Sequence, residues 1–301
     1  MMTGAQLRPW IERFAATIGL RLGLRLDERA AHDVVVRRAA ACGLSAAAYL
    51  GQFDAPDELR ALASELTVGE TYFFRHREQL DAFVDIALPA RLAAARDRRQ
   101  LAVLSAGCSS GEEPYTLAML VHDHVPADWQ VAIHGVDIDR RAIERATAGH
   151  YSRWSLRAVP PAVERRWFTR DRGDRGAWLD PALRAQVALA VHNLVDDSPL
   201  WARTWDTVFC RNVLMYFTAP QADVLIARIA RALAPGGYLF LGHAEMVWSR
   251  GGARGDRGDD VAAALAELET CSTHGTFYYR RRAAGPGDGR AISSIAPAAP
   301  V

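Results

Sequence analysis

Lysine is absent from this 301-residue chain, in which all 36 basic residues are arginine. Its absence excludes a P-loop lysine, a Schiff-base lysine and a lysine general base. Cysteine is scarce: the four residues lie far apart and form no CxxC pair. This spacing argues against a zinc knuckle or a redox dithiol and favours reduced thiols. No run of residues has the length and apolarity of a signal core or a membrane span, so we expect a cytoplasmic protein that does not insert into a membrane.

The chain also has little excess charge of either sign. Its formal net charge is +1, which gives no reason to expect wholesale binding to nucleic acid or to a membrane surface. Half of the residues are apolar, which is enough to build a core in each of two domains. We therefore expect two domains without a nucleic-acid partner.

The periodicity of apolar residues changes once along the chain. Residues 1–97 show only helical spacing, which predicts an all-helical N-terminal domain and linker. Residues 98–283 alternate helical stretches with short apolar runs, which predict strands at 101–107, 131–138, 187–195, 206–213, 237–243 and 276–282. This alternation predicts an α/β domain with a mainly parallel sheet. A small insertion interrupts it at about 152–186, and residues 284–301 are expected to form a flexible tail.

The segment "SAGCSSGEEPYTLAML", residues 105–120, predicts a strand, a small-residue turn and a helix, as in a first βα ligand loop. Neither GxGxxG nor GxxxxGK[ST] is present, so pyrophosphate binding is not supported. Pro114 is tolerated only in the first turn of a helix, which places the N-cap at residue 111 or later. One of Glu112 and Glu113 then faces the loop, where a carboxylate suits a cation or ribose hydroxyls rather than phosphate.

A second carboxylate follows the next predicted strand. The run "VAIHGVDID" ends in Asp137, some 26 residues after Gly111, near the spacing of an acid that binds ribose hydroxyls. Asp139 is interpreted as the N-cap of the following helix. A ligand that combines a ribose with a positive charge and lacks phosphate is S-adenosylmethionine.

These segments together resemble a known family. "SAGCSSGEEPYTLAM", "GVDID", "VHNLVDD", "DTVFCRNVLMYF" and "APGGYLFLGHAE", in this order, closely resemble the CheR-type chemotaxis receptor glutamate methyltransferases, and "ELTVGETYFFRHREQL" resembles their linker. The resemblance covers about residues 5–282. It implies a Rossmann-like S-adenosylmethionine-dependent methyltransferase domain with a small β-rich subdomain, preceded by an all-helical N-terminal domain.

The resemblance also implies the residues of the site. Residues carried over as cofactor-binding are Thr71, Arg75, Glu112, Asp137, Asn193, Leu194, Arg211 and Asn212. Arg75 and Tyr216 would lie near the transferred methyl group and act as the catalytic pair, and no metal is implied. Gly69 stands where related proteins often have asparagine, so it is left out of the site, and His243 is interpreted as structural. Which of Glu112 and Glu113 contacts the cofactor stays open, with Glu112 preferred.

The implied reaction needs little acid–base chemistry. A glutamate carboxylate, with an ordinary pKa of about 4.3, is already ionised at neutral pH, so no general base is required. Positioning then supplies most of the rate, and an arginine favours an anionic carboxylate over an amide or an amine. The expected products are a glutamate methyl ester and S-adenosylhomocysteine.

The implied partner is the cytoplasmic helical bundle of methyl-accepting chemoreceptors, contacted by a monomeric enzyme. Arg29, Arg37 and Arg38, on a predicted helix, are the candidates for docking to it. Two alternatives stay open: a methyltransferase for another substrate, such as RNA or a small molecule, and a regulatory protein that binds the cofactor without turnover. A nicotinamide oxidoreductase is disfavoured because GxGxxG is missing.

Overall fold

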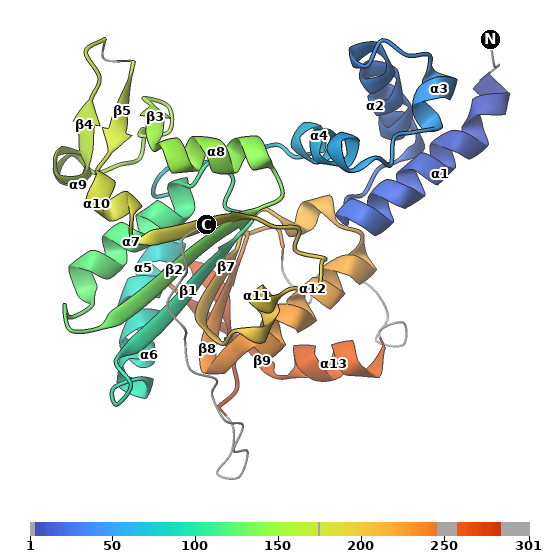
Figure 1. The fold of residues 1–301 in the computed structure, drawn as a ribbon. Coiled ribbons are helices and arrows are strands. Elements are labelled where there is room, and N and C mark those ends of the chain that lie inside the picture. Colours follow the sequence, from blue (N-terminus) through green and yellow to red (C-terminus); the bar gives the residue numbers. More distant parts are fainter. Residues whose placement is uncertain (1–3, 174, 246–257, 284–301) are drawn as a thin grey trace.

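The computed structural model describes residues 4–173, 175–245 and 258–283 (Figure 1). The expected flexible tail, 284–301, lies outside these residues, so that prediction is not addressed. Within the described ranges, no helix has both the length and the apolarity needed to span a membrane.

A seven-stranded sheet forms the centre of the molecule, with the strand order β6-β2-β1-β7-β8-β10-β9. The first five of these strands run parallel to their neighbours, whereas β10 is antiparallel to both β8 and β9. The strand bounds are β1 Gln100–Ala106, β2 Gln130–Asp137, β6 Val187–Val191, β7 Trp205–Cys210, β8 Leu233–Leu241, β9 Leu268–Thr273 and β10 Thr276–Arg281. This sheet is the predicted α/β architecture, with an antiparallel edge added to a parallel sheet.

Helices cover both faces of the sheet, as Figure 1 shows. One core joins the sheet to α7 and to the run α5, η1 and α6, and the core of the other face joins it to α12 and α13. The bounds are α5 Arg77–Ala82, the π-helix η1 Phe83–Ala87, α6 Leu88–Ala94, α7 Glu112–His124, α8 Arg140–Ala148, α11 Pro199–Ala202, the 3-10 helix η2 Leu214–Tyr216, α12 Ala219–Ala232 and α13 Asp259–Ala266. The layers explain why β1 is buried along nearly its whole length and β7 along all of it.

Four N-terminal helices pack around a core of their own, which runs from Ile11 to Ala63. Their bounds are α1 Gly4–Leu22, α2 Glu28–Ala41, α3 Ala46–Leu50 and α4 Pro56–Leu66. The helices between residues 77 and 94 instead bury Leu80 and Phe83 against the sheet. The packing therefore changes near residue 67, within the segment 1–97 that is expected to hold the helical domain and its linker.

The insertion forms a small three-stranded sheet with the order β3-β5-β4, at the upper left of Figure 1. Its elements are β3 His150–Ser152, α9 Pro161–Trp167, β4 Phe168–Arg170, β5 Gly176–Leu179 and α10 Pro181–Arg184. The β-rich character is as expected, and the subdomain joins the main core through Phe73, whose ring meets Tyr151 edge-on at 4.7 Å and Phe168 at 5.0 Å.

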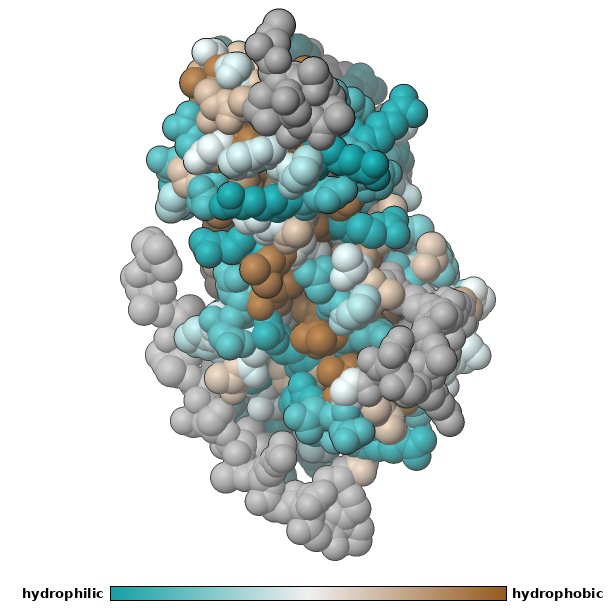
Figure 2. Space-filling view, turned by 90° about the vertical axis from the view of Figure 1, so that its right-hand side faces the viewer, coloured by the Kyte–Doolittle hydropathy of each residue, from teal (hydrophilic) through white to brown (hydrophobic). Residues whose placement is uncertain are grey.

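The face that carries the N-terminal helices is not uniformly polar. Figure 2 shows hydrophilic residues across these helices and hydrophobic residues gathered in the middle of the face below them. A cavity lies at the boundary between the helical unit and the sheet unit, and residues of both units line it.

Candidate functional site

A cavity of about 390 Å³ lies at the carboxyl ends of β1, β2 and β7. Its volume falls in the range of about 300–1,000 Å³ typical of small-molecule sites. Its position, beside the loop after the first strand of a parallel sheet, is where α/β folds bind their ligands. The sequence-predicted residues that line it are Thr71, Arg75, Asp137, Asn193, Leu194, Arg211, Asn212 and Tyr216.

The glycine loop does not offer a phosphate cradle. The amides of Gly107 and Cys108 both donate to the carbonyl of Val136, at 2.8 and 2.9 Å, and the amide of Ser109 donates to Asp137 Oδ2 at 2.7 Å. These amides donate to acceptors within the protein, whereas a phosphate-binding loop presents its amides to the ligand. Gly107 has φ +82° and leaves no room for a side chain, since a Cβ there would stand 2.3 Å from Val213. The loop therefore shapes the cavity rather than supplying donors to it.

Asp137 joins the loop to the next helix at the end of β2. Besides the amide of Ser109, it accepts a hydrogen bond from the amide of Asp139 at 2.9 Å. Burial raises the pKa of the Asp137 carboxyl, although these two amides oppose the rise. The two amide hydrogen bonds thus offset part of the cost of burying a carboxylate at the cavity wall.

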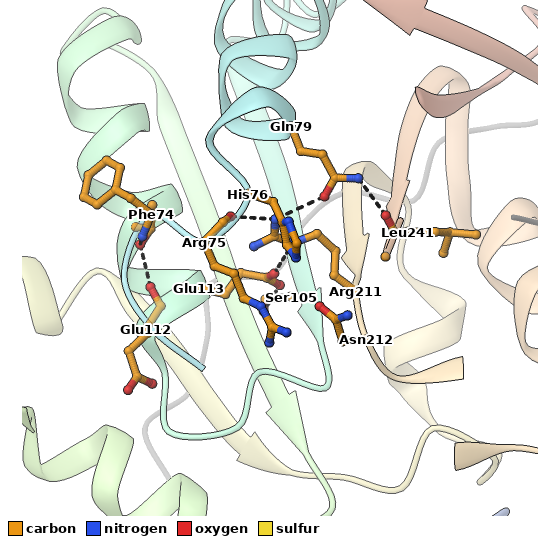
Figure 3. A network of polar contacts seen from close by, with 12 residues as sticks. Phe74, Arg75, His76, Gln79, Ser105, Glu112, Glu113, Arg211, Asn212 and Leu241 are labelled. Atoms are coloured by element: carbon orange, nitrogen blue, oxygen red, sulfur yellow. Dashed lines mark hydrogen bonds and ion pairs between the residues drawn. The ribbon is translucent and has the colours of Figure 1, made fainter. Parts of the chain in front are cut away.

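A buried ion pair, Arg211 with Glu113, forms part of the cavity wall, and Figure 3 shows its contacts. Arg211 Nε lies 2.6 Å from Glu113 Oε2, and the two side chains are only 3% and 11% exposed. The same guanidinium donates to the carbonyl of Arg75 at 2.8 Å and to Gln79 Oε1 at 3.1 Å. Gln79 in turn donates to the carbonyl of Leu241 at 2.7 Å. The network fixes the backbone of Arg75 relative to the ends of β7 and β8.

The preferred assignment of Glu112 is not the one the structure supports. Glu113 lines the cavity, whereas Glu112 does not. Glu112 is 2% exposed and accepts a hydrogen bond from the Ser110 hydroxyl at 2.8 Å, and burial raises the pKa of its carboxyl. The N-cap of helix α7 is Gly111, which has φ 92°, and successive residues of a helix point about 100° apart. The helix start thus turns Glu113 toward the cavity and Glu112 away from it.

Arg75 and Tyr216, the predicted catalytic pair, both line the cavity. The guanidinium of Arg75 donates to the carbonyl of Glu70 at 2.7 Å. The hydroxyl of Tyr216 accepts from the amide of Val68 at 3.1 Å and donates to the carbonyl of the same residue at 3.0 Å. Burial raises the pKa of Tyr216, so this hydroxyl keeps its proton. Tyr216 thereby holds the linker that carries Arg75 against η2.

The N-terminal unit closes one side of the cavity. Leu22 and Leu24 line it together with Leu194, and all three are buried. The side-chain amide of Asn193 donates to the carbonyl of Arg21 at 2.9 Å. Asn193 therefore ties the loop after β6 to the end of α1, a contact that sequence reasoning did not indicate.

The cavity suits a ligand that combines hydrogen-bond donors with a positive charge. Asn212 Oδ1 is buried and has no hydrogen-bond partner within the described structure. An acceptor of this kind costs free energy unless a ligand donates to it. With the carboxylates of Asp137 and Glu113 on the same wall, the acceptors match the ribose hydroxyls and the ammonium group of S-adenosylmethionine. The residues present therefore fit this cofactor.

Of the three docking candidates on α2, two form ion pairs with α4. Arg38 makes two hydrogen bonds of 2.7 Å to Glu58, and its side chain is 19% exposed. Arg37 lies 3.0 Å from Glu65 but stays largely exposed, and Arg29 is exposed. The guanidinium of Arg38 is thus engaged by Glu58 within the N-terminal unit, and its docking role stays a prediction.

Several site residues escaped sequence reasoning. Glu245 is 2% exposed and accepts hydrogen bonds from the amides of Asn212 and Gly242, both at 2.8 Å, which fixes the turn after β7. Gly69, left out for lack of a side chain, contributes its carbonyl to Ser109 Oγ at 3.2 Å, and a Cβ there would stand 2.9 Å from that oxygen. Glu245 stands in the "LGHAE" motif, which assigns it no role, and no sequence pattern indicated Gln79.

The fold and the site together define a Rossmann-like protein of the S-adenosylmethionine-dependent methyltransferase class. The sheet is mainly parallel with helices on both faces, the amides of the first loop are bonded within the protein, and carboxylates line the cavity. A family model described as "CheR methyltransferase, SAM binding domain" matches residues 69–253. The chain belongs to the CheR methyltransferase family and carries its S-adenosylmethionine-binding domain.

Individual relatives agree with this assignment. A probable biofilm formation methyltransferase, WspC of Pseudomonas putida, is 34% identical over 78% of this chain and 56% of its own length. A probable chemotaxis protein methyltransferase of Rhizobium etli is 34% identical over 62% of this chain and 71% of its own length. The chain thus spans little more than half the length of the first relative.

Among solved structures, the N-methyltransferase NodS of Bradyrhizobium japonicum, in complex with S-adenosylhomocysteine, is 19% identical and has a TM-score of 0.37. The alignment covers 70% of this chain and 89% of NodS. A likeness this loose carries no argument about the site.

Proposed function

We propose that this chain transfers the methyl group of S-adenosylmethionine to glutamate side-chain carboxylates of methyl-accepting chemoreceptors, and that it acts as a monomer in the cytoplasm. Its family membership supports the cofactor and the reaction class. The names of its relatives, which include chemotaxis protein methyltransferases of Rhizobium etli and Vibrio cholerae, support the receptor as the substrate.

The observation that carries the proposal is a clamped arginine on the cavity wall. Arg75 lines the cavity, and the buried pair of Arg211 and Glu113 fixes its backbone. A guanidinium binds a carboxylate through two parallel hydrogen bonds, which neither a neutral amide nor an amine can accept in the same way. Arg75 therefore selects an anionic acceptor and orients its oxygens.

The remaining residues of the wall have binding roles. Asp137 would hold the ribose hydroxyls, and Asn212 Oδ1 and Glu113 would hold the ammonium group of the methionine moiety. When bound, S-adenosylmethionine supplies an activated methyl group. Tyr216 contributes by holding the linker closed through Val68, which limits water at the acceptor. Because the acceptor carboxylate is already ionised, no residue of the chain has to remove a proton.

The receptor would approach the exposed side of α2. Arg29 and Arg37 remain exposed there, although Arg37 also forms an ion pair with Glu65. Exposed arginines of this kind attract an acidic helix at long range and contribute more to the association rate than to affinity.

The test is methyl transfer from labelled S-adenosylmethionine to cytoplasmic fragments of chemoreceptors, measured as base-labile methyl ester. Arg75→Ala removes the contact to the acceptor, and the loss of a charged hydrogen bond of about 1.5–3 kcal/mol predicts a kcat/KM lower by about 10- to 150-fold. Arg77→Ala is the matched control, since Arg77 lies two residues away, is 61% exposed and forms an exposed pair with Asp81.

Near-wild-type turnover by Arg75→Ala would refute the steering role. Tight cofactor binding without ester formation on any fragment would instead favour a regulatory protein that binds S-adenosylmethionine without turnover.

A further inference from the structure

A compact group of three side chains lies beside the site without lining its cavity. His76 precedes α5, Glu78 stands in the first turn of α5, and His243 follows β8. Glu78 Oε1 lies 2.6 Å from His243 Nε2 and 3.5 Å from His76 Nδ1, and the three potential ligand atoms lie within 4.8 Å of one another. None of the three residues is among those that line the cavity.

We propose that His76, Glu78 and His243 form a binding site for a divalent transition-metal ion of the zinc type. Two imidazoles and one carboxylate are a donor set that suits zinc, whereas magnesium and calcium prefer oxygen ligands alone. Three protein ligands leave one position of a tetrahedral ion for water. The side chains are 27%, 34% and 37% exposed, so an ion and its water can reach them.

The distances require side-chain movements, because the three ligand atoms are separated by up to 4.8 Å. Ligand atoms about 2.0–2.1 Å from a tetrahedral zinc ion lie about 3.3–3.4 Å apart. The separation of His76 and Glu78 already matches this value at 3.5 Å. The separation of His243 and Glu78 has to widen from 2.6 Å, and the imidazole proton has to move from Nε2 to Nδ1 of His243. Among the described residues His76 Nε2 has no hydrogen-bond partner, so none of them holds this ring in place through that nitrogen.

The surrounding charges set an upper limit to the affinity. Glu78 supplies one negative charge, whereas Arg75 and Arg211 are positively charged neighbours of His76. Arg211 is balanced by Glu113 at 2.6 Å, which leaves Arg75 as the main opposing charge. We therefore expect a dissociation constant in the micromolar range rather than that of a structural zinc site.

The site would connect two segments that carry the methyl-transfer residues. His76 follows Arg75 directly, and His243 follows Gly242, whose amide shares the Glu245 carboxylate with Asn212. An ion bound there would stiffen the turn of Arg75 against the end of β8. This consequence rests on the proposed function, whereas the metal site itself does not.

The experiment uses the full, tag-free, metal-free chain, titrated with Co²⁺ and followed by the visible absorption typical of tetrahedral cobalt, with Zn²⁺ as competitor. We expect one ion per chain, displaced by one equivalent of Zn²⁺. His243→Ala and Glu78→Gln should each weaken binding by at least about ten-fold. His274→Ala should leave it unchanged, because His274 forms a comparable pair with Asp85 (2.8 Å) that has no third ligand among the described residues.

Thermal melting and S-adenosylmethionine affinity of the variants establish that they are folded. The proposal is overturned if the wild-type chain binds neither ion more tightly than about 100 µM, or if the two site variants bind as well as the wild type. Since cobalt absorption does not depend on turnover, a chain that binds the ion but methylates no receptor would contradict the proposed function alone.

Discussion

Glu113→Leu is a substitution for which the structure predicts a large loss of stability. It removes the carboxylate that lies 2.6 Å from Arg211 Nε, in a pair whose side chains are 3% and 11% exposed. Arg211 would keep only neutral acceptors, the carbonyl of Arg75 and Gln79 Oε1. A buried guanidinium would thus lose its counter-charge without access to water.

Removing one partner of a buried ion pair costs about 3–5 kcal/mol, because the other charge stays desolvated. Ser105 also loses the acceptor of its 2.7 Å hydrogen bond, which adds about 0.5–1.5 kcal/mol. In a domain of this size, each kcal/mol lowers the melting temperature by about 2–4 °C. The combined cost of about 3.5–6.5 kcal/mol therefore corresponds to a decrease of about 7–26 °C.

Calorimetry and denaturant unfolding of four chains measure the effect: the wild type, Glu113→Leu, Arg211→Met and the double variant. Each single variant should be strongly destabilised, and the double variant should recover most of the loss because no buried charge remains. Asp123→Ala, which breaks the exposed pair with Arg166, should cost about 1 kcal/mol or less. A Glu113 variant no less stable than this control would refute the reasoning.

Two further outcomes follow from the cavity wall. Tyr216→Phe keeps the ring but loses both hydrogen bonds to Val68, so S-adenosylmethionine affinity, measured by calorimetry, should weaken by about five-fold for a net loss of about 1 kcal/mol. A lower kcat at unchanged affinity would show instead that Tyr216 acts on the reacting groups. Asp137→Ala removes the acceptor of two amides and of the proposed ribose contact, so the same affinity should fall by at least about ten-fold. An unchanged dissociation constant would contradict the ribose assignment.

The sheet was largely predictable because buried parallel strands leave apolar runs in the sequence. The six predicted runs correspond to β1, β2, β6, β7, β8 and β10. Strand β9, Leu268–Thr273, was missed because it lies at the edge of the sheet and only Leu268 is fully buried, so its sequence "LETCST" shows no apolar run. The runs predicted for 187–195 and 206–213 end earlier, at Val191 and Cys210, because the chain there leaves the sheet to line the cavity.

The sequence predicted a site residue well where a motif contains it. It predicted less well which way a side chain points. Pro114 correctly limited the start of α7, since the N-cap is Gly111. Which of the two following glutamates faces the cavity depends on how that helix is rotated against β1, which no local pattern specifies. Arg38 shows the same limitation over a longer distance, because its partner Glu58 lies 20 residues away on another helix.

The interface between the helical unit and the sheet unit has a consequence for engineering receptor preference. Gln221 Nε2 donates to the carbonyl of Gly19 at 2.6 Å, and the amide of Arg25 donates to the carbonyl of Tyr216 at 2.7 Å. Between these two contacts, Leu22 and Leu24 form part of the cofactor cavity. A chimera that exchanges the N-terminal helices with those of a relative therefore has to keep residues 19–25 of this chain, so that a new docking surface is acquired without remodelling the cofactor cavity.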